Sequence, residues 1–191
     1  MMPTRFRILM VSDILIAGSY GLIMPILPLF MVERVSGTNL QTVAVAQAIY
    51  LLSQAGFSWV FGSYQQHKQL AKRSHGGLVV GSIIVTLVPI IYLFSRDISQ
   101  IFLAQLLLGL GFGLIYPAWT WMAKEEIQEQ HLKSVKKIYD VVLSLALAFM
   151  AVAGGFVAYR YGFHQLLMLM SALGLCGTVL AISLWYDHIK S

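Results

Sequence analysis

The chain has 191 residues, of which 58% are hydrophobic and only 11% are charged, and its net charge is +5. Soluble domains carry about 25% charged residues, so a soluble enzyme of this composition would expose far too much apolar surface. The composition also excludes a disordered or collagen-like chain, and the single cysteine, Cys176, excludes an intrachain disulfide framework. The positive charge does not indicate nucleic-acid binding, because no basic polar face with interleaved aromatic residues accompanies it.

Six apolar runs follow one another along the chain, and each approaches the ~20 residues that a helix needs to cross a bilayer. They cover residues 6–32, 42–63, 77–94, 101–122, 139–159 and 165–186. The first run is too long for a secretory signal sequence and predicts one retained helix. No run alternates with a period of two, as the wall of a membrane β-barrel would. We therefore predict an all-α integral membrane protein, a single domain of six transmembrane helices.

Basic residues are concentrated on one side of the predicted membrane domain. Ten of the 13 lysines and arginines lie in the N-terminal segment, in the connections after the second and fourth runs, and in the C-terminal tail. Only Arg34, Arg96 and Arg160 fall on the other side. Cytoplasmic segments carry the excess of Lys and Arg. We therefore expect a multi-pass protein of the bacterial inner membrane with both termini in the cytoplasm.

A short string recurs in the first and fourth runs. Gly21–Pro25 (GLIMP) matches Gly113–Pro117 (GLIYP) at an offset of 92 residues, and the same offset pairs Gly62 with Gly154. The chain is therefore predicted to contain two three-helix repeats, over about 6–95 and 98–187, unless apolar helices share the string by chance. Because three crossings is an odd number, the second copy must be inverted in the membrane. Inverted three-helix repeats are typical of secondary transporters.

The same segments resemble the major facilitator superfamily, specifically its N-terminal six-helix half, over essentially the whole chain. Pro25 and Pro28 are similar to the Pro-x-x-Pro of the first helix in the drug/proton antiporter branch. The segment 105–113 resembles the Arg-x-x-x-Gly-x-Gly pattern of the fourth helix, and Gly154 with Gly155 resembles the end of the antiporter motif. Small residues and prolines in these segments suit close packing and kinks. The helix-kink and packing positions are Gly21, Pro25, Pro28, Gly109, Gly113, Pro117, Gly154 and Gly155.

The segment after the second run departs from the family pattern Gly-x-x-x-Asp-Arg-x-Gly-Arg-Arg. Gly62 is present, but Gln66 and His67 stand where the family has Asp and Arg. Only the basic character of the loop is retained. The resemblance therefore implies a cytoplasmic gating loop of altered sequence. Its predicted residues are Gly62, Lys68, Lys72 and Arg73.

Asp13 is identified as the only acid inside an apolar run. A membrane-embedded carboxylate costs about 2.5–3.5 kcal/mol at the centre of a helix, and such residues are usually functional. At helical spacing Asp13 shares a face with Tyr20, with which it could exchange a proton. Its position two turns past Arg7 is also compatible with a place at the inner interface.

Uncharged polar side chains form two further stripes, one on the second run and one on the fourth. Such stripes either contact a substrate or join helices by hydrogen bonds worth about 1 kcal/mol or less. Together with Asp13 and Tyr20 they are the predicted substrate and proton pathway. The stripe residues are Gln47, Tyr50, Gln54, Gln105 and Tyr116.

No catalytic, metal or cofactor site is predicted. The histidines fall in or beside loops, no metal-ligand spacing occurs, and no phosphate-binding glycine loop is present. Gly56-Phe57-Ser58-Trp59 also lacks the Gly-x-Ser-Gly pattern of a rhomboid protease. We therefore expect a non-enzyme, surrounded by the lipid bilayer, that moves a small organic solute, with protons as the candidate co-transported ion.

Two other functional classes stay open at this level. The chain could be a substrate-binding or assembly subunit of a multi-component transporter, or a truncated half that transports nothing. One six-helix half cannot provide alternating access, because the cavity of the family lies between two bundles. The transporter interpretation therefore predicts a homodimer or a separate C-terminal half. The second and fifth helices would meet that partner, and the third and sixth would face lipid or the back of the bundle.

Overall fold

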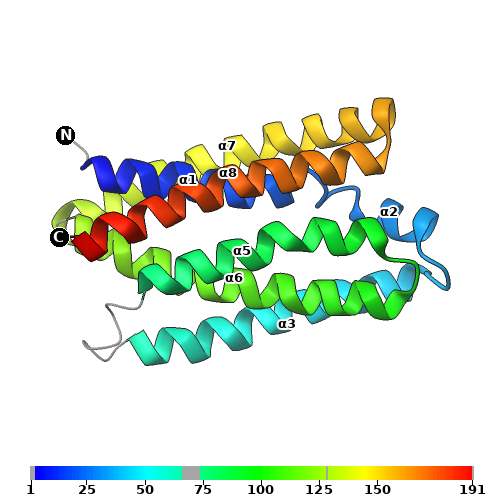
Figure 1. The fold of residues 1–191 in the computed structure, drawn as a ribbon, viewed down its shortest axis with the longest axis horizontal. Helices are drawn as coiled ribbons and strands as arrows, with labels where there is room; N and C mark the ends of the chain where they lie inside the picture. Colours follow the sequence, from blue (N-terminus) through cyan, green and yellow to red (C-terminus); the bar gives the residue numbers. More distant parts are fainter. Residues whose placement is uncertain (1–2, 66–73, 128, 191) are drawn as a thin grey trace.

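The computed structural model of the chain describes residues 3–65, 74–127 and 129–190 (Figure 1). Apart from one isolated bridge between Ser36 and Asp97, this part of the chain contains no strand. The all-α prediction is therefore confirmed. The helices within the described residues are α1 (Thr4–Gly21), α2 (Leu27–Arg34), α3 (Leu40–Gln65), α5 (Ser74–Phe94), α6 (Ile98–Glu126), α7 (Glu129–Tyr161) and α8 (Phe163–Lys190).

Five stretches within these helices are long and apolar enough to cross a membrane. They are Leu40–Ser63, Ser74–Phe94, Ile98–Glu126, Gln130–Tyr161 and Phe163–Tyr186. They correspond in order to the second to sixth predicted helices. The largest difference is at α7, which begins at Glu129 rather than near 139. Hydropathy marks only the apolar part of a helix, and α7 starts with polar turns before that part.

The prediction of one unbroken helix over residues 6–32 is wrong. The chain leaves the helix after Gly21 and becomes helical again at Leu27. Pro25 and Pro28 have no amide hydrogen, so neither can donate the helical hydrogen bond to the residue four positions earlier. Pro28 instead occupies the first turn of α2, where an amide would have no helical partner. The first crossing of the bundle is thus a broken helix made of α1 and α2.

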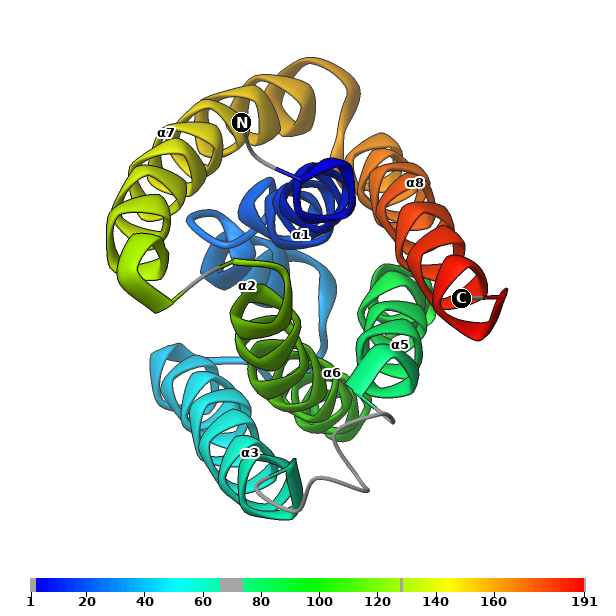
Figure 2. The same cartoon turned by 90° about the vertical axis from the view of Figure 1, so that its left-hand side faces the viewer.

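The long helices form an arc in the order α3, α6, α5, α8, α1 and α7, each packed on its neighbours. Figure 2 shows α3 and α7 at the two ends of this arc and α5 beside α8 at its back. In an apolar 18-residue stretch of each helix, buried residues make up only 11% in α3 and 6% in α7, against 50% in α5 and α6. The two end helices therefore leave most of their apolar surface uncovered by this chain.

Glycines allow the closest helix contacts. A side-chain carbon on Gly109 would lie 2.5 Å from the Cβ of Ser53, and one on Gly113 would lie 2.7 Å from the Cβ of Phe57. α3 and α6 can therefore approach this closely only because both positions lack a side chain. Gly162, between α7 and α8, has a φ of +90°, which only glycine adopts without strain. It makes the tight turn that returns the chain into the bundle.

Candidate functional site

The carboxyl group of Asp13 on α1 is contacted by a side chain from α7. The Tyr139 hydroxyl donates a hydrogen bond to Oδ2 of Asp13. The Tyr139 ring stacks in turn on Trp119 of α6, with ring centroids 4.5 Å apart and planes 27° from parallel. Tyr139 and Trp119 are buried and Asp13 is half-buried. Tyr139 of α7 therefore links the carboxyl group on α1 to an aromatic ring on α6.

A cavity of about 190 Å³, called here the Asp13 cavity, lies beside this group. It brings together Asp13, Gln54 and Tyr116, three predicted pathway residues from α1, α3 and α6. Within the described residues Asp13 forms no ion pair, and the Tyr139 hydroxyl is the hydrogen-bond donor to its carboxyl group. The lining residues are Asp13, Ala17, Gln54, Phe112, Ile115, Tyr116, Trp119, Lys136, Tyr139, Asp140 and Leu143.

Tyr20 and Tyr50, also predicted for the pathway, lie next to this cavity rather than in its lining. Their ring centroids are 5.7 Å apart, and Phe112 lies 5.9 Å from Tyr20 and 6.3 Å from Tyr50. The Tyr20 hydroxyl is buried and has no hydrogen-bond partner among the described residues. A buried polar group without a partner costs about 1–3 kcal/mol, so this hydroxyl is available to a polar atom of a solute.

The two remaining predicted pathway residues lie away from the Asp13 cavity. Gln105 is buried in α6, and its amide oxygen has no hydrogen-bond partner in the described part of the chain. Gln47 is half-buried on α3. Neither side chain lines the cavity. The structure therefore brings only part of the two polar stripes together.

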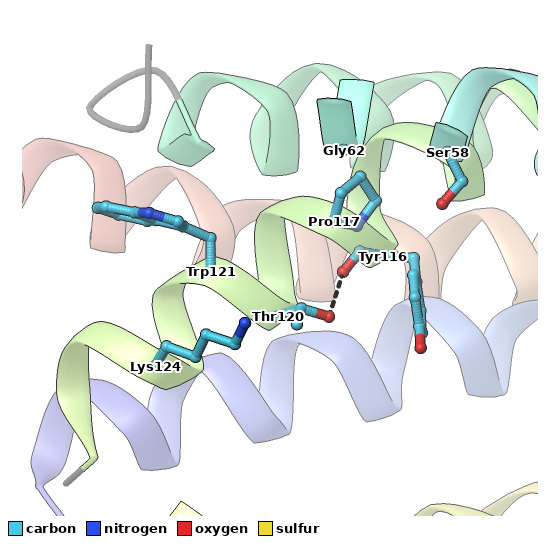
Figure 3. Close-up of a pocket in the computed structure, with 7 residues that line it drawn as sticks. All are labelled: Ser58, Gly62, Tyr116, Pro117, Thr120, Trp121 and Lys124. Carbon is cyan, nitrogen blue, oxygen red and sulfur yellow. Dashed lines mark hydrogen bonds between the residues drawn. The ribbon is translucent and has the colours of Figure 1, made fainter. Parts of the chain in front are cut away.

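A larger cavity of about 420 Å³, called here the α3–α6 cavity, lies between α3 and α6 (Figure 3). Tyr116 lines both cavities, so its side chain lies between them. Gly62, predicted for the gating loop, lies in the wall of the α3–α6 cavity at the end of α3. The other predicted residues of that loop, Lys68, Lys72 and Arg73, lie outside the described residues. The lining residues are Ser58, Gly62, Tyr116, Pro117, Thr120, Trp121 and Lys124.

The sequence model of the Major Facilitator Superfamily matches residues 9–190. The chain belongs to the Major Facilitator Superfamily. A comparison with curated proteins gave no match. Members of this superfamily are membrane transporters rather than enzymes, so the chain is a multi-pass, transporter-like membrane protein. Within its described residues no group of three or more His, Cys, Asp or Glu side chains is placed to hold a metal ion.

The predicted packing glycines of this Major Facilitator Superfamily chain fall into two groups. A side-chain carbon on Gly21 would lie 2.9 Å from Leu147 Cδ2, and one on Gly154 would collide with the carbonyl oxygen of Leu22. Gly154 therefore lets α7 approach the break after α1. Gly155, in contrast, has nothing within 4 Å of the position where a side chain would begin. Gly155 takes no part in packing within this chain.

Four residues with polar side-chain atoms line the Asp13 cavity of this superfamily member but were not predicted for the pathway. They are Trp119, Lys136, Tyr139 and Asp140. Asp140 also shows that Asp13 is not the only acid in an apolar run, because it is the second residue of the run over 139–159. That acid next to a tyrosine was the available signal. Nothing in sequence spacing relates Tyr139 to Asp13, because 126 positions separate them.

Proposed function

We propose that the chain is one six-helix half of a secondary transporter that moves a small organic solute through the Asp13 cavity. The observation that carries this proposal is the position of that cavity. Its lining comes from α3 and α7, the ends of the arc, and from α1 and α6 between them. Figure 2 shows the side of the arc that α3 and α7 enclose, and a cavity lined by both of these helices lies on that inner side. Solute pathways of inverted-repeat transporters lie between bundles in the same way.

A second six-helix bundle would complete the wall of the pathway. The spans of α3 and α7 are the least buried of those in the described residues, and both border the open side of the arc. Alternating access requires two bundles that rock against each other around one site. The partner we propose is a second copy of this chain or a separate C-terminal half.

Asp13 is the residue we propose to couple the solute to protons. A carboxylate inside the membrane domain is costly unless it is paired or protonated. Within the described residues Asp13 has the Tyr139 hydroxyl as a hydrogen-bond donor and no ion pair. Such a group can respond to a proton or to a charged solute in the adjoining cavity.

The excess of Lys and Arg in alternate connections supports an inner-membrane orientation with cytoplasmic termini.

The test is proton movement driven by solutes in liposomes that contain the purified protein and a trapped pH indicator. A panel of small organic cations, anions and neutral solutes is added to one side, and at least one should change the internal pH. Asp13→Asn should abolish this signal, whereas the control Glu33→Gln, an exposed carboxylate on α2, should retain it. Solute movement that continues at the wild-type rate in Asp13→Asn would remove Asp13 from the pathway.

The same preparation separates the proposed function from its alternatives. Saturable solute binding without movement in either direction would contradict transport by this chain and favour a substrate-binding or assembly subunit. Absence of both binding and movement would favour a half that transports nothing. Movement that appears only above the concentration at which the chain dimerises would support the two-bundle arrangement.

A further inference from the structure

α3 and α6 separate from each other toward the end of the bundle that contains Lys124. A side-chain carbon on Gly113 would lie 2.7 Å from α3, but one on Gly62, farther along, would lie 3.9 Å from Pro117. Pro117 removes a hydrogen bond from α6 at this level and so favours a bend there. Figure 1 shows α3 diverging from α6 toward this end. The α3–α6 cavity occupies the space that results.

The α3–α6 cavity reaches both sides of the helix arc. Trp121 makes an edge contact with His75 at the start of α5, with centroids 6.5 Å apart, so it lies on the outer side between α3 and α5. Tyr116 lies about 140° from Trp121 around α6, since each helical residue turns the chain by about 100°. On that inner side Tyr116 also lines the Asp13 cavity. The α3–α6 cavity therefore extends from Trp121 to Tyr116, and the Tyr116 side chain lies between it and the Asp13 cavity.

The lining combines a cation with hydroxyl groups and flat apolar surfaces. Lys124 extends along α6 toward Thr120, and the Thr120 hydroxyl donates to the carbonyl oxygen of Tyr116 at 2.9 Å (Figure 3). The rings of Tyr116 and Trp121 supply apolar surface beside these polar groups. The acids that follow Lys124 in the sequence are not part of the lining. This arrangement fits a molecule with an anionic head and an apolar body.

We propose that the α3–α6 cavity is a side entrance through which a single-chain amphipathic anion, such as a long-chain carboxylate, passes from the bilayer into the Asp13 cavity. This inference rests on the proposed transport function and names its substrate class. A volume of about 420 Å³ lies within the usual range of small-molecule sites. In the Asp13 cavity Lys136 offers a second cation to the head group, and it balances one of the two carboxylates, Asp13 and Asp140, that share the lining.

The test measures binding separately from transport. The purified chain in phosphatidylcholine nanodiscs is titrated with 11-(dansylamino)undecanoate, and energy transfer from tryptophan to the dansyl group is recorded against empty nanodiscs. We expect saturable transfer that Lys124→Gln weakens about tenfold, as expected for the loss of one charge-assisted hydrogen bond. The methyl ester of the probe, which has no charge, should bind Lys124→Gln and the wild type equally.

A second variant blocks the cavity without touching its charge. Gly62→Phe should reduce binding of the probe at least tenfold, because the new ring enters the space beside Pro117. The matched control is Gly56→Phe on the same helix, where nothing lies within 4 Å, and it should bind the probe normally. Binding that is unchanged in both Lys124→Gln and Gly62→Phe would overturn the proposal.

Comparing probe binding with solute movement separates the side entrance from the proposed transport function. Comparing two lipid compositions separates it from a binding site for a lipid headgroup. Saturable binding with the expected variant pattern, but no solute movement in liposomes, would support the anion site and contradict the transport function. Solute movement without saturable probe binding would support transport and overturn the side entrance. Loss of probe binding when phosphatidylglycerol replaces part of the phosphatidylcholine, with no effect on transport, would assign the site to a resident lipid headgroup and also overturn the entrance.

Discussion

Thr86 on α5 and Thr178 on α8 face each other at the back of the bundle, with their hydroxyl oxygens 3.0 Å apart. They are 92 positions apart, which is the offset between the GLIMP and GLIYP strings. Equivalent residues of two copies touch each other only where the axis that relates the copies passes between them. The contact therefore supports an inverted duplication whose axis runs between α5 and α8.

The other helix contacts follow the same exchange. α6 packs on α3 and α5, and α1 packs on α7 and α8, so exchanging the first three crossings with the last three preserves the order. At residue level Gly113 packs against Phe57, and its counterpart Gly21 packs against Leu147. The offset of 92 pairs Phe57 with position 149, which is two residues from Leu147. The fold thus places both kinked segments of the repeat opposite the end helices of the arc.

The Thr86–Thr178 hydrogen bond predicts a measurable coupling between α5 and α8. Thr178 also donates to the carbonyl oxygen of Gly174 at 2.9 Å, so Thr86 supplies the proton for the shared bond. Hydrogen bonds between membrane helices contribute about 0.6 kcal/mol on average. A double-mutant cycle of Thr86→Val and Thr178→Val, measured by unfolding in detergent, should give a coupling of about that size. A cycle of Thr86→Val with Thr120→Val should give none, because Thr120 bonds only within α6.

Two adjacent glycines of α7 predict opposite effects of the same substitution. Gly154→Ala should lower the midpoint of thermal unfolding by several degrees, because the added carbon collides with the Leu22 carbonyl and overpacking costs about 1–3 kcal/mol. Gly155→Ala is the matched control, since its new carbon meets nothing within 4 Å. It should leave the midpoint unchanged or raise it slightly, because alanine favours a helix. Equal midpoints for both variants would contradict the close approach of α7 to the break after α1.

The fold was largely predictable because hydropathy depends on local composition. Runs of apolar residues located five of the six crossings, and the repeated GLIMP string indicated how the two triplets relate. Hydropathy did not predict the break between α1 and α2, because Pro25 and Pro28 lie within a long apolar run. The missing amide hydrogens of these prolines do not change the hydropathy of the run. Local hydrogen bonding, not hydropathy, decides where that helix ends.

The site was predictable only where one helix carries the signal. Asp13, Gln54 and Tyr116 were found because each is a polar residue in an apolar run, and they do line one cavity. Tyr139 was missed because its role depends on α7 crossing beside α1, and that is a property of the packing. Lys136 contributes to the predicted membrane orientation, but its place in the cavity wall also depends on how α7 packs.

The distribution of basic residues predicts that both termini are cytoplasmic. A fluorescent protein that folds only in the cytoplasm should be bright when fused to the C-terminus. Alkaline phosphatase, which is active only outside the cytoplasm, should be silent at the same position. The two reporters should show the opposite activities when fused after Arg96, because three crossings, an odd number, precede that position and six precede the C-terminus. A bright phosphatase signal at the C-terminus would invert the orientation.

The hydrogen bond from Tyr139 to Asp13 predicts that the tyrosine hydroxyl, and not its ring, stabilises the carboxylate. Tyr139→Phe keeps the stack on Trp119 but removes the donor. It should reduce the free energy of unfolding by about 1.5–3 kcal/mol, the usual worth of a hydrogen bond to a charged group. In an Asp13→Asn background the same change should cost much less. Tyr161→Phe, at an exposed position of α7, is the control and should have no effect in either background.

The exposed faces of α3 and α7 predict where a second copy would bind. Two arcs that close on each other about an axis along the membrane normal bring α3 of one copy against α7 of the other. In a Cys176→Ser background, co-expressed Ala55→Cys on α3 and Ala148→Cys on α7 should therefore crosslink between differently tagged copies. Val80→Cys on α5 with Val179→Cys on α8 should not, since these helices form the back of the arc. Crosslinks through α5 and α8 alone would reject the two-bundle arrangement, because the Asp13 cavity would then face away from the partner.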